Sequence, residues 1–210
     1  MRILLTGASG GIGSTIKDVL IENEIIVESL TSKDIDLSKP FIFEDDTGYD
    51  GLIHCAGKNV VQKYSEISYD NMSIISNINT NSFITLCKEM NFNKGSNIVA
   101  IGSIWSTRTK EGRLAYTMSK HALYGAVKTL SLEMSEDNIK VNMISPGFVD
   151  TEMTRANNSK EKIKEINDFT PLGMVPPQEI ANLCMYMVSK NKFITGQNII
   201  VDGGYSNRSF

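Results

Sequence analysis

Six short apolar runs, spread over the whole chain, constrain its fold more than any other sequence feature. Most of their positions are β-branched or otherwise strongly apolar, which is typical of strands that are buried on both faces. Longer stretches with apolar residues at helical spacing lie between them. We therefore predict a doubly wound α/β fold, with a parallel sheet of about six to seven strands, helices on both faces and one domain over residues 1–210. The predicted strands are Ile3–Leu5, Ile25–Val27, Leu52–Ala56, Ile98–Ile101, Val141–Ile144 and Ile199–Val201, and the later predicted helices are Asp70–Met90, Tyr116–Met134, Lys160–Ile166 and Pro177–Val188.

The composition argues against several classes of protein. The 21 lysines and arginines and the 24 acidic residues give a net charge of -3, so no basic excess draws the chain onto nucleic acid. No apolar stretch approaches the ~18 residues of a membrane span, and glycines follow the N-terminus too early for a signal peptide. The 3 cysteines and 2 histidines are too widely spaced for a metal site, so we expect no metal. We expect a cytoplasmic protein that does not bind membranes.

A glycine-rich turn, Thr6-Gly7-Ala8-Ser9-Gly10-Gly11-Ile12-Gly13, connects the first predicted strand to the first predicted helix. In an open α/β sheet this position binds phosphates, because missing side chains let backbone N–H groups and the helix N-terminus approach them. The spacing is G-x-x-x-G-x-G. A purely structural turn is the alternative, and a P-loop is excluded because no Lys-Ser or Lys-Thr pair follows within Gly7–Ser14.

Candidate catalytic residues lie in the middle of the chain. Ser103 ends the fourth predicted strand, where a parallel sheet exposes groups to a ligand, although a serine there can equally cap or turn the chain. Tyr116 and Lys120 are four residues apart on one helix face, where the ammonium would lower the pKa of the phenol. Tyr124 and Lys128 repeat this spacing, so the spacing alone does not identify a site.

The combination of these motifs resembles the classical short-chain dehydrogenase/reductase family, in particular members similar to 3-oxoacyl-acyl-carrier-protein reductase. Ser103 stands 13 positions before Tyr116, as the family's serine does, whereas Glu111 stands 13 before Tyr124. Further matching segments extend the resemblance over most of the chain: Asp50–Gly57, Val141–Gly147, Thr195-Gly196 and Val201–Gly204.

The resemblance implies a Rossmann-like fold and a mechanism. The family's tyrosine, here Tyr116, donates a proton to a carbonyl oxygen while nicotinamide delivers a hydride, and the reverse reaction oxidises an alcohol. Ser103 would hydrogen-bond that oxygen, and Lys120 would hold the ribose and lower the tyrosine pKa. The fourth catalytic residue would be Asn79, with Asn77 as the alternative.

The resemblance also implies the coenzyme contacts. NADP(H) is favoured and NAD(H) is possible, because no acidic residue stands at 30–32 and Ser32 with Lys33 could meet a 2′-phosphate, although Gly10 lacks the basic side chain that many NADP-dependent members carry. The expected coenzyme-binding residues are Gly7, Ser9, Gly10, Gly11, Ile12, Gly13, Ser32, Lys33, Asp36, Leu37, Ala56, Gly57, Tyr116, Lys120, Pro146, Gly147, Val149 and Thr151.

Two departures from the family pattern stand out. His54-Cys55 replaces the usual Asn-Asn pair, and the interval from Gly13 to Ala56 is too short for the family's second helix and full third strand. We therefore expect the sheet to lose or shrink one edge strand.

The substrate is weakly encoded. The family layout implies a pocket around Ile104, Trp105, Leu114 and Phe148 under a lid at residues 148–172, for a small or carrier-bound carbonyl compound. Acyl-carrier-protein thioesters, sugar nucleotides and small ketones all remain candidates. A coenzyme-binding regulator or scaffold without turnover is the alternative to an enzyme.

A homodimer or homotetramer is expected. The helices at 70–90 and 116–134 carry apolar residues on more than one face, and Ile84 and Val127 are predicted at the contact, unless the chain's own sheet covers both helices.

Overall fold

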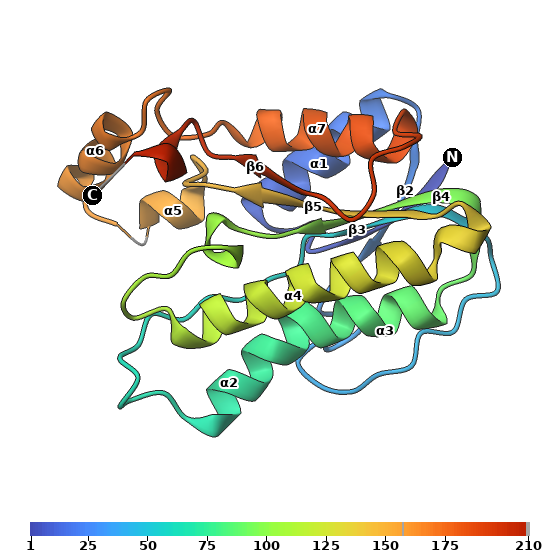
Figure 1. The fold of residues 1–210 in the computed structure, drawn as a ribbon, viewed down its shortest axis with the longest axis horizontal. Helices are drawn as coiled ribbons and strands as arrows, with labels where there is room; N and C mark the ends of the chain where they lie inside the picture. The colour runs from blue at the N-terminus through green and yellow to red at the C-terminus, as the bar shows by residue number, and fades with distance from the viewer. Residues whose placement is uncertain (157, 209–210) are drawn as a thin grey trace.

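The computed structural model describes residues 1–156 and 158–208, which form one sheet with helices on both faces (Figure 1). All neighbouring strands are parallel, in the order β2-β1-β3-β4-β5-β6. The chain moves outward from β1 in one direction and from β3 in the other, so the order reverses between these two strands, which is where such sheets bind ligands. The strands are β1 (Arg2–Thr6), β2 (Ile26–Leu30), β3 (Tyr49–His54), β4 (Phe92–Ile101), β5 (Lys140–Pro146) and β6 (Asn198–Val201).

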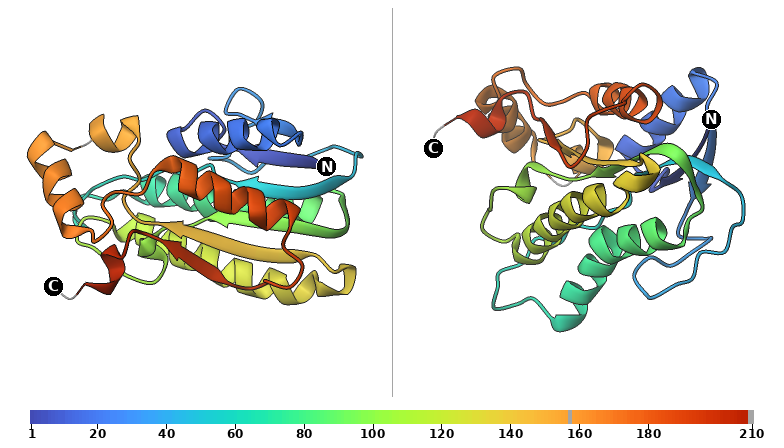
Figure 2. Two further views of the ribbon diagram at one scale, coloured as in Figure 1. Left: turned by 90° about the horizontal axis from the view of Figure 1, so that it is seen from above. Right: turned by 45° about the vertical axis from the view of Figure 1, so that its right-hand side comes forward.

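The helices cover the two faces unequally, as Figures 1 and 2 show. Helices α1 (Gly11–Glu22) and α7 (Pro177–Ser189) pack side by side on one face. The other face carries α2 (Tyr69–Ser76), α3 (Ser82–Glu89) and α4 (Leu114–Glu133). The short helices α5 (Glu152–Ala156) and α6 (Lys160–Phe169) lie beyond the carboxyl ends of the strands, near the described C-terminal residues. Among the described helices, none is long and apolar enough to cross a membrane.

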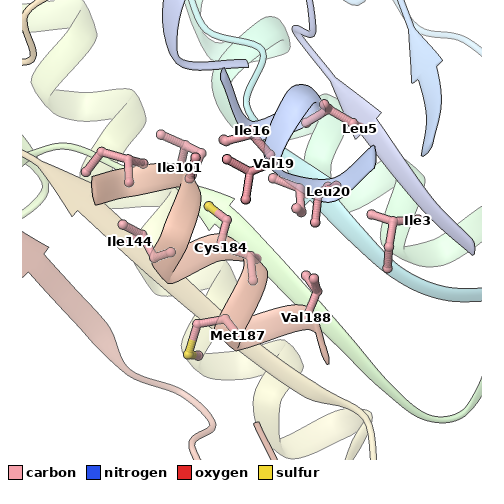
Figure 3. Packing of buried hydrophobic residues seen from close by; sticks show 14 of the residues in the cluster. Ile3, Leu5, Ile16, Val19, Leu20, Ile101, Ile144, Cys184, Met187 and Val188 are labelled. Atoms are coloured by element: carbon pink, nitrogen blue, oxygen red, sulfur yellow. The ribbon is translucent and has the colours of Figure 1, made fainter. Parts of the chain in front are cut away.

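Each face of the sheet has its own hydrophobic core. In the first, Ile16 and Leu20 of α1 face Cys184 and Val188 of α7, with Ile3 of β1 nearby, and all five side chains are buried (Figure 3). The second core joins the other face of the sheet to α3 and α4. Each fully buried leucine or isoleucine contributes roughly 1.5–3 kcal/mol, so these two layers fix the positions of the strand ends.

The predicted α/β fold and its six strands are confirmed. The segment 31–48 between β2 and β3 contains no helix or strand, so β2 is an edge strand, as the short interval predicted.

The prediction of one continuous helix over Asp70–Met90 is wrong, because the segment is divided. A π-helical turn, Asn77–Asn81, separates α2 from α3. The Ile78 carbonyl accepts a hydrogen bond from the Ser82 hydroxyl within the helical segment, and it also contacts His54 Nε2 on β3 at 3.2 Å, so the turn depends in part on a contact from outside the helix.

The prediction that Val127 lies at a contact between subunits is also wrong for the described chain. Val127 is 0% exposed and belongs to the core between α4 and the sheet, whereas Ile84 is 41% exposed. The large apolar side chains that α4 exposes are Leu114, Met118 and Leu132.

Candidate active site

The glycine-rich turn passes very close to the neighbouring strand end. Gly7 has φ 71°, and a Cβ there would lie 2.6 Å from the backbone nitrogen of Ala56. A Cβ on Gly13 would lie 2.1 Å from the carbonyl oxygen of Gly7, so neither position accepts a side chain. Gly10 caps α1 without a side-chain acceptor, which leaves the first N–H groups of that helix available to an anion.

Ser103 follows β4, caps the turn after it and also contacts Tyr116. Its Oγ accepts the backbone N–H of Trp105 at 3.3 Å, and its own N–H donates to the Ser106 hydroxyl at 3.2 Å, so it caps the 3-10 helix Ile104–Ser106. Ser103 also hydrogen-bonds the Tyr116 side chain, an interaction that lowers the pKa of the phenol. The cap fixes the serine at the carboxyl edge of the sheet, where it faces the tyrosine.

Lys120 lies on α4, one helical turn after Tyr116. It is 3% exposed, its Nζ donates to the carbonyl oxygen of Ile101 at 2.7 Å, and it lies 5.8 Å from the centroid of the Tyr116 ring. Burial lowers the pKa of Lys120 to about 8. The ammonium is therefore the major form at neutral pH.

The tyrosine pKa differs from the expectation. Burial is the largest influence and raises the pKa of Tyr116, while the hydrogen bond from Ser103 and the positive charge of Arg113 lower it.

Asn79 lies on the π-helical turn and faces the same site. Its Oδ1 accepts the backbone N–H of Lys58 at 2.7 Å, and its Nδ2 donates to the Lys58 carbonyl at 3.0 Å and to the Ser119 hydroxyl at 2.9 Å. Gly57 lies beside it, since a Cβ there would be 3.7 Å from Asn79 Oδ1 and 3.8 Å from Lys120 Nζ. Asn77, the alternative, instead donates to the Ser38 carbonyl at 2.8 Å. The geometry favours Asn79.

The predicted coenzyme residues surround this site from several segments. Ser9, Gly10, Gly11 and Ile12 form the start of α1, and a Cβ on Gly11 would lie 2.9 Å from the Thr151 side chain. Pro146 and Gly147 end β5, and Val149 bridges to Val175. These residues lie at the carboxyl edge of the sheet, and the start of α1 has no side-chain cap, so the chain fits the pyrophosphate of a dinucleotide.

The residues predicted around the adenosine lie after β2. Ser32 and Lys33 are exposed there, Leu37 packs against the second core, and the Asp36 carboxylate accepts from Ser38 and pairs with Lys39 at 3.3 Å. Asp34 also lies at this position and was not among the predicted residues. Its carboxylate folds back onto β2 and accepts the N–H and hydroxyl of Thr31 at 2.8 and 2.7 Å. A Thr-x-x-Asp pattern is the signal that could have revealed this turn.

A cavity of about 590 Å³ lies beside Ser103, and we call it the aromatic cavity after its walls of Trp105, Phe148, Phe169 and Tyr205. Two of the four residues predicted for the substrate, Trp105 and Phe148, line it. Ile104 is 2% exposed and belongs to the interior, and Leu114 is 44% exposed on α4, so neither lines the cavity. The missed lining residues are polar or come from the predicted lid: Arg108, Thr109, Lys110, Lys162, Glu165 and Ile166.

The described residues contain no group of three or more His, Cys, Asp or Glu that could hold a metal ion. Cys55, Cys87 and Cys184 are free thiols.

Comparison with known proteins agrees with this geometry. Residues 39–206 match a family model described as enoyl-(acyl carrier protein) reductase. A 3-oxoacyl-[acyl-carrier-protein] reductase from Chlamydia trachomatis is 34% identical over 161 residues, which cover 74% of this chain and 64% of that protein.

Two solved structures share the whole fold. A short chain dehydrogenase family protein from Francisella tularensis has a TM-score of 0.87 and 28% identity, and 99% of each chain is covered. A 4-hydroxyisoleucine dehydrogenase mutant complexed with NADH and succinate has a TM-score of 0.86 and 25% identity, and 100% of each chain is covered.

The fold, the site and these relatives define a class: the NAD(P)-dependent oxidoreductases that interconvert carbonyl compounds and alcohols. Within that class, the chain belongs to the short-chain dehydrogenase/reductase family, with similarity to 3-oxoacyl-acyl-carrier-protein reductases.

Proposed function

We propose that this protein reduces a carbonyl compound, or oxidises the matching alcohol, with Tyr116 as the proton donor and acceptor. The observation that carries the proposal is the convergence of four side chains beside the glycine-rich turn: Ser103 hydrogen-bonds Tyr116, while Lys120 and Asn79 both lie against Gly57. Ser103, Asn79 and Lys120 are buried and Tyr116 is half-buried, and polar groups gathered in this way are costly unless they serve a ligand or a reaction.

The coenzyme supplies or accepts the hydride when bound. We assign its pyrophosphate to Gly10, Gly11 and the N-terminus of α1, and its nicotinamide ribose to Tyr116 and Lys120. The exposed Ser32 and Lys33 support a preference for NADP(H), because their hydroxyl and ammonium groups can bind a 2′-phosphate.

The chain's own residues then handle the proton. Hydride transfer to a carbonyl builds negative charge on its oxygen, so the hydroxyls of Ser103 and Tyr116 stabilise the transition state more than the ground state. Tyr116 releases its proton to that oxygen. The Lys120 ammonium and the Ser103 hydroxyl stabilise the phenolate that remains, which offsets the effect of burial on the tyrosine pKa.

A regulator or scaffold without turnover is less favoured, because it would not need the four polar side chains at the site. The free thiols of all three cysteines agree with a cytoplasmic location. The aromatic cavity has room for a small molecule or the end of a carrier-bound chain.

Tyr116→Phe tests the mechanism. We expect it to lose nearly all turnover while its affinity for NADPH stays within about threefold, because only the proton donor is removed. Tyr124→Phe is the matched control, since Lys128 lies 5.6 Å from the Tyr124 ring centroid in the same spacing but without a serine partner. If Tyr116→Phe kept more than about a tenth of wild-type kcat, the assignment would be wrong.

A further inference from the structure

The aromatic cavity lies close to the active site along the chain. Trp105 stands two residues after Ser103, in the 3-10 helix that Ser103 caps, and Phe148 directly follows Gly147. The charge of Arg113 affects the pKa of both Tyr116 and Lys110, so the site and the cavity are near neighbours. A substrate whose carbonyl meets Tyr116 would therefore place its remainder among the aromatic rings. Phe148 and Phe169 both contact Tyr205 edge-on, with ring centroids 5.1 Å apart in each pair.

The charged residues of this cavity are unbalanced. Arg108, Lys110 and Lys162 contribute three positive charges, and Glu165 contributes one negative charge. Lys162 and Glu165 pair with each other at 2.8 Å. Within residues 1–156 and 158–208, no carboxylate lies within ion-pair distance of Arg108 or Lys110.

The surroundings of Lys110 are positive on balance. Partial burial lowers the pKa of Lys110, the nearby charges of Arg113 and Lys162 lower it further, and the Glu165 carboxylate raises it. The Lys110 ammonium lies 6.0 Å from the centroid of the Phe148 ring, at the apolar wall of the cavity. An anionic group bound in the cavity would supply the counter-charge for Arg108 and Lys110, which both line its wall.

Resting on the function proposed above, we propose that the substrate is an oxyanion, with a carboxylate or phosphate group bound by Arg108 and Lys110 and an apolar spacer between that group and the reacting carbonyl. The planar guanidinium of Arg108 matches either group, because it can donate two parallel hydrogen bonds to their oxygens. The four aromatic side chains bind the spacer.

Equilibrium binding tests the anion site without any turnover. Trp105 is the only tryptophan of the chain, so its fluorescence reports occupancy of the cavity. Hexanoate, butyl phosphate and neutral hexanol are titrated at constant ionic strength. We expect saturable binding of the two anions and at least tenfold weaker binding of hexanol, since a charge-assisted hydrogen bond contributes about 1.5–3 kcal/mol. Hexanol binding as tightly as hexanoate would overturn the proposal.

Variants distinguish the contribution of Arg108 and Lys110 to anion binding from that of the general surface charge. The double variant Arg108→Gln/Lys110→Gln should weaken both anions at least tenfold and leave hexanol unchanged. Lys164→Gln is the matched control, because Lys164 is exposed on α6 and does not line the cavity. Equal weakening of the anions by the double variant and by Lys164→Gln would also overturn the proposal.

Turnover then separates this inference from the proposed function. A 3-oxo acid, its methyl ester and a phosphorylated ketone are compared as substrates with NADPH and NADH. We expect the charged compounds to have a kcat/KM at least tenfold above that of the ester, and the double variant to remove this difference. Anion binding without reduction of any carbonyl compound would reject the proposed function while leaving the anion site in place. Equal kcat/KM for acid and ester in the wild type would reject the anionic substrate alone.

Discussion

The His54 imidazole and the Thr6 hydroxyl form a buried hydrogen bond, with 3.0 Å between Nδ1 and Oγ1. The Thr6 Oγ1 already accepts the backbone N–H of Ala56 at 3.1 Å, so its own hydrogen points to the imidazole. The other ring nitrogen, Nε2, lies 3.2 Å from the carbonyl oxygen of Ile78 and therefore carries the hydrogen of the neutral ring. One neutral histidine thus connects the ends of β1 and β3 to the π-helical turn that carries Asn79.

This histidine should make the free energy of unfolding depend on pH. Burial lowers the pKa of His54 to about 3, whereas an unfolded histidine titrates near ~6.5. Between these pH values the unfolded chain binds a proton that the folded chain does not, so the free energy of unfolding falls as pH falls. The slope contributed by His54 should approach about 1.4 kcal/mol per pH unit.

Urea denaturation at pH 6.5, 5.5 and 4.5 measures that slope. His54→Asn should flatten it, because asparagine can keep the bond to Thr6 without titrating. His121→Asn, on the exposed side of α4, should keep the wild-type slope. An identical slope for His54→Asn and the wild type would contradict the role assigned to the buried imidazole.

The π-helical turn illustrates what the sequence could not predict. Apolar residues recur at helical spacing through Asp70–Met90, so a local pattern indicates one continuous helix. The turn depends on His54, which is 24 residues away and whose contact to Ile78 exists only after β3 has joined the sheet. By contrast, the strands and the glycine-rich turn were predictable because their signals are local: short apolar runs, and positions such as Gly7 where a side chain would collide with Ala56.

The aromatic cavity was predictable only in part. The family layout predicted Trp105 and Phe148, but no local pattern adds Tyr205, which is more than fifty residues further along the chain, to the same wall. Val127 shows a second limit of prediction from the sequence, which concerns the face that a helix buries. A helix with apolar residues on several faces does not reveal which face its own sheet covers.

Lys120 provides a second pH-dependent prediction. Its pKa of about 8 means that the ammonium is present below that pH and lost above it. If it holds the nicotinamide ribose as proposed, the affinity for NADPH should fall about tenfold between pH 7 and 9.5, because a hydrogen bond from a charged donor becomes one from a neutral amine. Coenzyme fluorescence titrations measure this. Lys120→Met should bind weakly with little dependence on pH, and a flat wild-type profile would refute the role.

Coenzyme choice depends on the turn after β2. We expect a higher kcat/KM with NADPH than with NADH, and Lys33→Ala should reduce the NADPH value about tenfold while changing the NADH value less than twofold, since only NADPH carries the 2′-phosphate. Steady-state kinetics with both coenzymes test this. A clear preference for NADH would contradict it and would assign the ribose contact to the carboxylate of Asp34, which lies against Thr31 at the end of β2.

The last prediction concerns assembly. Exposed apolar or small residues follow one face of α4 from Met118, which is 55% exposed, through Gly125 to Leu132, which is 76% exposed. A Cβ on Gly125 would meet nothing within 4 Å, so a second helix could approach closely there. We therefore expect a homodimer or homotetramer in which α4 meets its symmetry mate, and one substitution acts twice at each such contact.

Sedimentation velocity of the wild type and of Met118→Glu tests the contact. We expect the variant to shift toward monomer. Its subunit should stay folded, with a thermal midpoint within a few degrees of that of the wild type diluted to monomer, because Met118 is not part of the core. Ile84→Glu on α3 should weaken assembly in the same way.

Two further variants are controls for this test. Ile21→Glu on α1, which is 52% exposed on the opposite face of the sheet, should leave assembly intact. Val127→Glu should instead unfold the subunit, since it places a charge in the core beside the sheet. A monomeric wild type at micromolar concentration would contradict the prediction.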